Sequence, residues 1–211
     1  MTKIRTRPAA GPGRLNKSVE AGLAVSCVTD EELVAALQSG DMQSLGQLVV
    51  RWERPLYRFV SRMVPRSEDA RDVCQETFLR ILNRAGRFRS GSRFSTWMYQ
   101  IALNLCRDQA RRRRRWGKIV DDGKQAPTET TASAGLNPEA GTERNEMARA
   151  VQNGLLEIPA EQREVLILKE YEGLKFKEIA ELLSCPESTV KSRMYYGLNG
   201  LKSALARQGI R

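Results

Sequence analysis

The sequence contains no histidine, and its four cysteines are far apart, without any C-x-x-C pair. Because zinc sites draw on closely spaced cysteines and histidines, we predict no metal site and no other cofactor. The absence of histidine also removes the commonest general base, and no carboxylate cluster has metal-binding spacing, so the pattern argues against an enzyme. We interpret the cysteines as reduced thiols of a cytoplasmic protein.

Long apolar runs are missing too, and aromatic residues make up only 6% of the chain. No stretch approaches the roughly 18 consecutive apolar residues that a membrane span requires, so we expect no membrane insertion. Cations near the N-terminus, such as Lys3 and Arg5, are not followed by a continuous apolar segment. A signal peptide is therefore not expected either.

Positive charge is what the sequence has in excess, with a formal net charge of +10 and a pI of about 9.8. Between Arg107 and Lys118, seven cations stand against one acid, and five of the cations are consecutive arginines. Such a balance predicts a polyanionic partner, with nucleic acid favoured over an anionic membrane surface.

Composition divides the chain into four segments. Residues 1–28 carry scattered cations and no periodic apolar stripe, which predicts a disordered tail. Residues 118–142 are rich in Ser, Thr, Gly, Ala and Pro and are locally acidic, which predicts a flexible linker. The helical patterns lie in the remaining segments, 29–117 and 143–211. We therefore expect an all-α protein of two small helical domains.

Apolar residues spaced three and four apart predict the first three helices, over residues 29–40, 42–64 and 67–85. Thr29 and Ser67 are the N-cap candidates, and Pro55 inside the second pattern predicts a kink. The third helix also carries a polar face that includes one leucine. An exposed leucine among acids and an amide suits protein docking, although a solvated face with one stray apolar residue is the simpler interpretation. The residues of this face are Asp72, Gln75, Glu76 and Leu79.

A fourth helix is predicted to start between Ser92 and Ser95, after a Gly/Ser loop. Its aromatic residues are expected to turn most of their surface into the core, while its outer face changes from amides to arginines. Aromatics can stack on unpaired bases and arginines can hold phosphates, so this region suits single-stranded DNA. A solvated or RNA-binding patch would produce a similar pattern. The candidate DNA contacts are Arg89, Ser92, Phe94, Trp97, Asn104, Arg107 and Arg111.

The chain ends in two helical patterns separated by a short turn. Ser184 and Glu187 match a capping box at the start of the second pattern. Two helices joined in this way indicate a helix-turn-helix, whereas a helical hairpin with a solvated basic face is the plainer alternative. The apolar side of the second helix is predicted to hold Val190, Met194, Leu198, Leu201 and Leu205. Its solvent side, which would enter a major groove, holds Ser188, Thr189, Lys191, Ser192, Arg193, Tyr195 and Tyr196.

Taken together, the segments DVCQETFLRIL and FSTWMYQIALNLCRDQARRRR and the stretch from Ile158 to Leu205 resemble a known family. They look like a bacterial RNA polymerase sigma factor of the extracytoplasmic-function (ECF) group of the sigma-70 family, over roughly residues 30–206. The resemblance implies a region 2-like helical bundle joined by a flexible linker to a region 4-like helix-turn-helix. It implies core RNA polymerase and promoter DNA as partners, and relatives are commonly held inactive by an anti-sigma factor.

The resemblance also implies a role for each candidate surface. The face around Glu76 would dock on the clamp helices of the largest polymerase subunit. The loop from Arg89 to Ser95, with the helix that follows it, would open and read the minus-10 element. The helix over 188–196 would read the minus-35 element. Relatives often carry arginine at the position of Tyr196, so the chain departs from the family pattern there.

Two other classes fit part of the pattern. A stand-alone helix-turn-helix transcription regulator would act on duplex DNA without polymerase, but it would need a dimerisation or ligand-sensing domain that the sequence does not indicate. A recombinase or transposase would need a nucleophilic serine beside arginines, or a metal-binding acid triad. Ser92 and Ser95 near Arg93 are the candidates for such a serine, and their helical setting argues against this class.

Overall fold

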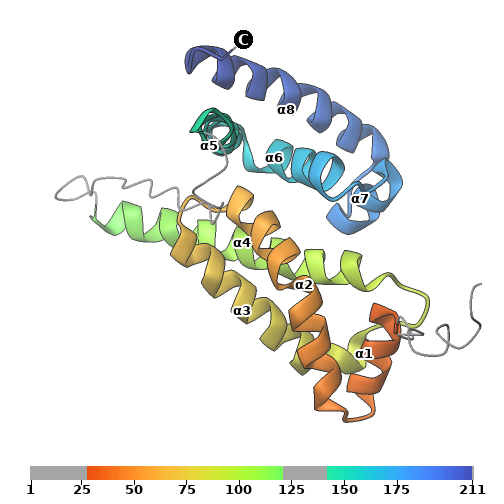
Figure 1. The fold of residues 1–211 in the computed structure, drawn as a ribbon. Helices are drawn as coiled ribbons and strands as arrows, with labels where there is room; N and C mark the ends of the chain where they lie inside the picture. The colour runs from red at the N-terminus through yellow and green to blue at the C-terminus, as the bar shows by residue number, and fades with distance from the viewer. Residues whose placement is uncertain (1–27, 121–141, 211) are drawn as a thin grey trace, which may run out of the picture.

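The computed structural model describes residues 28–120 and 142–210, and all regular structure within these ranges is helical, as predicted. Figure 1 shows two groups of helices, α1–α4 and α5–α8, which we call the N-terminal and C-terminal modules. Residues 1–27 of the predicted tail and 121–141 of the predicted linker lie outside the described residues. The helices are α1 (Asp30–Gln38), α2 (Met42–Met63), α3 (Ser67–Arg84), the short η1 (Ala85–Arg87), α4 (Phe94–Val120), α5 (Thr142–Glu157), α6 (Ala160–Leu166), the π-helical η2 (Ile167–Tyr171), α7 (Phe176–Leu183) and α8 (Glu187–Arg207).

The start of α1 is fixed by a capping box between Thr29 and Glu32. The backbone N–H of Glu32 donates to the Thr29 hydroxyl at 3.2 Å, and the backbone N–H of Thr29 donates to the Glu32 carboxylate at 2.7 Å. These hydrogen bonds satisfy N–H groups that the first helical turn leaves without partners, and they lower the pKa of Glu32. The predicted cap at Thr29 is therefore confirmed.

The core of the N-terminal module lies between α2, α3 and α4. Leu48, Leu56 and Phe59 of α2 are fully buried, as are Phe94 and Met98 of α4. Such burial contributes roughly 1.5–3 kcal/mol for each large apolar side chain, which is enough to hold three amphipathic helices together. None of the described helices is long and apolar enough to cross a membrane.

Two predicted caps are wrong. Ser67 is the first residue of α3, and Arg66 is the N-cap without a side-chain hydrogen bond. Ser184 does not cap α8, because it adopts a left-handed conformation (φ 52°) that ends α7, and Pro186 occupies the N-cap. Glu187, the expected partner of Ser184, pairs instead with Lys191 at 2.7 Å. The geometry of the tight turn thus overrides the local pattern.

The buried side of α8, which we call its seam, differs from the predicted apolar stripe. Its buried residues are Val190, Gly197 and Ala204, seven apart, whereas Leu198 is 46% exposed. A Cβ atom at Gly197 would stand 3.1 Å from the Leu166 Cδ1 atom of α6. The small residues therefore let α8 approach α6 so closely that the larger side chains lie beside the seam.

The two modules pack directly against each other. α2 contacts α5, α6 and η2, and α4 contacts α7. The Gln152 amide donates to the Ser61 carbonyl oxygen at 3.0 Å, and the Arg62 guanidinium lies 3.9 Å from the centre of the Tyr171 ring. Buried apolar residues of both modules form one continuous cluster. The position of each module therefore depends on the other.

Replacing Gly197 by valine should destabilise the protein by about 1–3 kcal/mol, because the new side chain would overlap Leu166. Urea unfolding followed by circular dichroism measures this change. Asn199→Val is the matched control, because Asn199 is exposed on the same helix. Equal stability of the two variants would contradict the close approach of α8 to α6.

Candidate nucleic-acid interface

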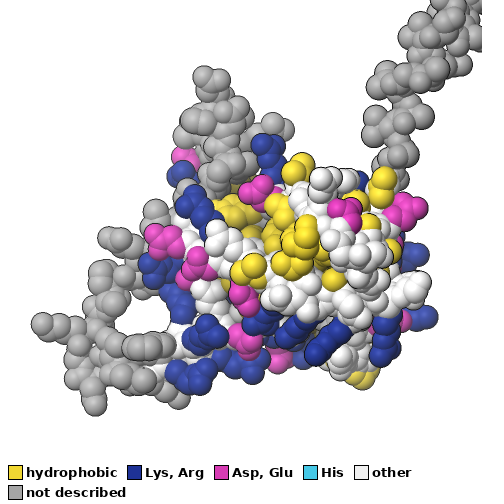
Figure 2. Space-filling model, turned by 90° about the horizontal axis from the view of Figure 1, so that it is seen from below, with side chains coloured by type: hydrophobic (Ala, Val, Ile, Leu, Met, Phe, Trp, Pro, Cys, Tyr) yellow, Lys and Arg dark blue, Asp and Glu magenta, His cyan; other side chains and the backbone are white. Residues whose placement is uncertain are grey.

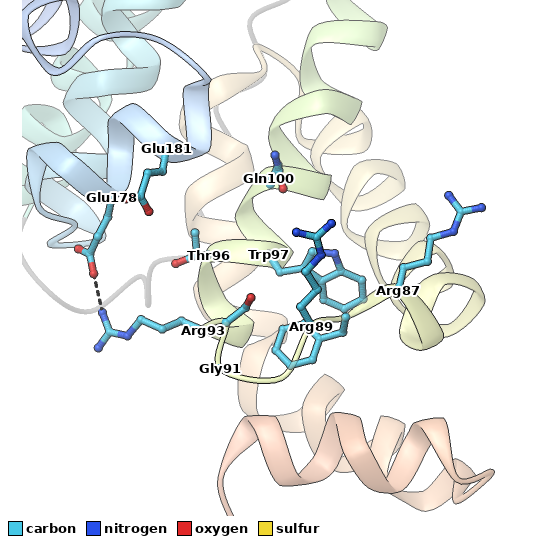
Figure 3. Close-up of a pocket in the computed structure, with 11 residues that line it drawn as sticks. Arg87, Arg89, Gly91, Arg93, Thr96, Trp97, Gln100, Glu178 and Glu181 are labelled. Atoms are coloured by element: carbon cyan, nitrogen blue, oxygen red, sulfur yellow. Dashed lines mark hydrogen bonds and ion pairs between the residues drawn. The ribbon is translucent and has the colours of Figure 1, made fainter.

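A pocket of about 520 Å³ lies where the loop after η1 meets α4 and α7. The loop turns at Gly91, whose φ of +84° is a conformation that glycine adopts without strain. The pocket combines cations, an aromatic ring, a hydroxyl and an amide, which together suit an unpaired base and its phosphate. Figure 3 shows how its lining residues converge from the loop and the two helices: Arg87, Phe88, Arg89, Gly91, Ser92, Arg93, Thr96, Trp97, Gln100, Glu178 and Glu181.

The loop is held by polar contacts from α1 that the sequence analysis missed. The Gln38 amide donates to the carbonyl oxygens of Ala85 (2.8 Å) and Phe88 (3.2 Å). At the other end of the loop, the Phe94 backbone N–H donates to the Glu31 carboxylate at 2.8 Å. Both contacts join residues about 50 or more positions apart, so no local pattern indicates them. These hydrogen bonds from α1 hold the loop that forms one wall of the pocket.

The two candidate aromatics have different environments. Phe94 is fully buried and packs against Trp52 and Trp97, with ring centres 6.0 Å and 6.3 Å away, so no ring face of Phe94 reaches the surface in this structure. Trp97 is half-buried and also contacts the Phe88 ring at 5.2 Å. Both rings pack toward the core as predicted and Trp97 lines the pocket, but Phe94, at 0% exposure, offers no surface for the DNA contact predicted for it.

The outer face of α4 is only partly open. Asn104 is exposed, and Arg111 is exposed beside Asp108 at 3.5 Å. Arg107 instead makes a two-pronged ion pair with Glu164 of α6, through Nε (2.7 Å) and Nη2 (2.5 Å). Glu164 is 2% exposed, and its hydrogen bonds raise the pKa of Arg107. Arg107 is thus engaged by the C-terminal module rather than presented to solvent.

A second contact between the modules is partly buried. The Tyr99 hydroxyl, which the sequence analysis did not single out, donates a short hydrogen bond to the Glu172 carboxylate. Burial raises the pKa of both groups, so the phenol remains protonated as the donor. Because the two partners are 73 residues apart in the chain, no local sequence pattern predicts this contact.

The helix-turn-helix is formed by α7 and α8, and most predicted groove-facing residues are accessible. Tyr195 and Tyr196 are 65% and 60% exposed, and their rings contact each other edge to face. Arg193 folds back onto Glu161 of α6 at 2.6 Å and is less accessible. Ser188, Lys191 and Ser192 are exposed, and Thr189 is partly exposed.

The predicted docking face of α3 is open to solvent. Asp72 and Gln75 are exposed, Leu79 is 54% exposed, and Glu76 forms an ion pair with Arg80 at 2.9 Å. Figure 2, which views the molecule from below, shows a group of hydrophobic side chains near the middle of the view and a row of Lys and Arg side chains below it. Among the described residues, no three His, Cys, Asp or Glu side chains are placed to hold a metal ion.

Comparisons with known proteins agree with this geometry. The family model "Sigma-70 region 2" matches residues 48–116, and "Sigma-70, region 4" matches residues 148–199. Over 180 residues the chain is 31% identical to the "RNA polymerase sigma-H factor" of Pseudomonas aeruginosa, which covers 83% of this chain and 93% of the relative. Over 181 residues it is 35% identical to the "ECF RNA polymerase sigma-E factor" of Escherichia coli strain K12, with coverage of 80% and 90%.

Solved structures share the fold. The structure titled "Structure of CnrH in complex with the cytosolic domain of CnrY" matches with a TM-score of 0.62 and 25% identity, over 84% of this chain and 97% of that one. The sigma factor RpoE of Bartonella quintana, solved with the anti-sigma factor NepR, matches with a TM-score of 0.65 over 78% of this chain and 98% of that one. Its identity is 22%, so this second likeness concerns the fold alone.

Two buried thiols should resist alkylation in the native protein. Burial raises the pKa of Cys74 and that of Cys106 to about 12, so their thiolate fraction at pH 8 falls roughly a thousandfold below that of an ordinary cysteine. Iodoacetamide labelling read by peptide mass spectrometry should be slow at both sites and become fast in urea. Rates that are the same in native buffer and in urea would contradict this burial.

Proposed function

Because the chain belongs to the ECF sigma factors of the sigma-70 family, we propose that its two modules divide promoter recognition between them. As an ECF sigma factor, it binds core RNA polymerase and directs promoter-specific initiation of transcription, and it is not an enzyme. The observation that carries the division of roles is the arginine-rich loop beside Trp97, which belongs to a different module from the exposed face of α8. The comparisons do not favour a stand-alone transcription regulator.

In this proposal the pocket receives an unpaired base of the minus-10 element. The half-buried ring of Trp97 offers a stacking surface, while Arg89 and Ser92 on the loop contact the backbone. Asn104 and Arg111 continue the path along α4. Arg107 joins this path only when its ion pair with Glu164 opens. Extruding a base costs a few kcal/mol, which these contacts would offset.

The proposed minus-35 reader is the N-terminal half of α8. Short hydroxyls and the Lys191 ammonium point to solvent near the helix N-terminus, where a recognition helix contacts base edges and phosphates. Tyr195 and Tyr196 extend this surface.

The proposed polymerase contact is the open face of α3 around Leu79. Such a protein works in the cytoplasm, and an anti-sigma factor as a further partner stays a prediction.

Run-off transcription tests the whole proposal. Purified core polymerase is incubated with a library of upstream sequences, with and without this chain. The expected result is a set of defined start sites that requires the chain. Start sites that are the same with and without it would contradict the proposed promoter recognition.

Glu76→Arg should weaken association with core polymerase at least about tenfold, because it reverses the charge at the centre of the docking face. The helix should remain folded, since the side chain of Glu76 is not buried. Glu53→Arg is the control, with the same charge reversal at an exposed position of α2. Co-purification with core enzyme measures the difference, and equal binding of both variants would remove this face from the proposal.

Lys191→Ala should lower duplex affinity and reduce the slope of log K against log salt by about 1, because one phosphate contact is lost. Lys202→Ala, about three turns further along α8, is the control and should leave the slope unchanged. Fluorescence anisotropy on one duplex across a salt series gives both slopes. A slope that Lys191→Ala does not alter would count against groove contact by this end of α8.

A further inference from the structure

The C-terminal module places carboxylates at three points along α4 and the loop that precedes it. The residues that receive them extend over fourteen positions, from the loop into the middle of α4, which corresponds to about 20 Å of helix. Two of the three contacts are ion pairs with arginines, and one is a hydrogen bond with a phenol. The pairs are Arg93 with Glu178, Tyr99 with Glu172, and Arg107 with Glu164.

At the pocket, two carboxylates of α7 face the arginine loop. Figure 3 shows Glu178 and Glu181 extending from α7 toward the loop, where Glu178 Oε1 lies 3.1 Å from Arg93 Nη1. Both acids line the same pocket as Arg87 and Arg89. A carboxylate beside an arginine occupies the place that a phosphate would take, because both anions accept the same N–H donors.

We propose that these carboxylates are an intramolecular competitor for DNA phosphates, so that packing of the two modules and binding of single-stranded DNA to the pocket exclude each other. This inference rests on the proposed role of the pocket in reading the minus-10 element. It adds regulation: in the free chain the C-terminal module pairs with Arg107 and borders the pocket with two acids, so it occupies part of the surface that the N-terminal module uses on DNA.

The contacts differ in how readily they open. Arg93 is 70% exposed, so its pair with Glu178 is weak and is screened by salt. Arg107 and Glu164 form a mostly buried pair that salt screens much less. DNA therefore displaces the contact of Glu178 with Arg93 first. The pair of Arg107 with Glu164 holds the two modules in their relative position.

Cys106 provides a native reporter of opening. It lies in a cavity of about 270 Å³ between the modules, whose wall includes Leu156 and Arg163 of the C-terminal module. Separation of the modules would remove that wall and expose the thiol. Cys74, buried in the N-terminal module, serves as an internal reference because it does not line this cavity.

The test compares two double variants of the full chain with the same change in charge. Glu178→Gln/Glu181→Gln removes the carboxylates at the pocket, and the amide introduced at position 178 keeps an oxygen for the backbone N–H of Lys175, which now donates to Glu178 at 2.7 Å. Glu146→Gln/Glu170→Gln removes two exposed acids of the same module that do not line the pocket. Anisotropy with a labelled single-stranded oligonucleotide of mixed sequence gives affinity, and alkylation of Cys106 relative to Cys74 gives opening.

The pocket variant should bind the oligonucleotide roughly two- to fivefold more tightly than the control variant, because exposed ion pairs contribute little each. Its Cys106 should be alkylated faster, and adding the oligonucleotide to the wild-type chain should accelerate that alkylation. Equal affinity of the two double variants would overturn the competition and leave the DNA role of the pocket intact. Failure of every protein to bind the oligonucleotide would overturn both.

Discussion

The ion pair between Arg107 and Glu164 fixes how the two modules of this sigma factor meet. Its carboxylate is 2% exposed, so both of its oxygens must find donors, and the planar guanidinium supplies them at 2.7 and 2.5 Å. A buried pair of this kind adds little net stability, because desolvation offsets the attraction. Leaving either charge alone would be costly, however. The pair therefore selects one arrangement of the modules, which the neighbouring contact of Tyr99 with Glu172 also requires.

This arrangement leaves the functional surfaces unequally accessible. The docking face of α3 and the tyrosines of α8 are open, whereas the pocket is bordered by acids of α7 and Arg107 is already paired. In the proposed scheme, the chain can meet polymerase first, while Arg107 is still paired with Glu164 and the pocket is still bordered by acids. DNA phosphates then replace the carboxylates as partners of the arginines. Opening therefore exchanges one ion pair for another and does not leave the arginines unpaired.

The sequence predicts the fold well because local rules decide it. Amphipathic periodicity locates the helices, and Thr29 forms the predicted N-cap, which the structure extends to a capping box with Glu32. The similar Ser-x-x-Glu pattern at Ser184 fails, because a three-residue turn demands a left-handed residue there. Neither the partner of Arg107, 57 residues away, nor the glycine seam of α8 could be predicted, since both depend on how the helices pack. The chemistry of the side chains predicts the candidate DNA contacts, but it cannot predict their burial. Phe94 is buried, whereas Trp97 is only half-buried.

The central claim is that packing of the two modules and binding of promoter DNA compete for Arg107 and for the arginine-lined pocket. The most direct test is the distance between two spin labels, one at exposed position 83 of α3 and one at exposed position 199 of α8, measured by double electron–electron resonance. The account predicts one narrow distribution for the free chain, and a distribution at longer distances in the complex with core polymerase and promoter DNA. The same distribution in both states would contradict it.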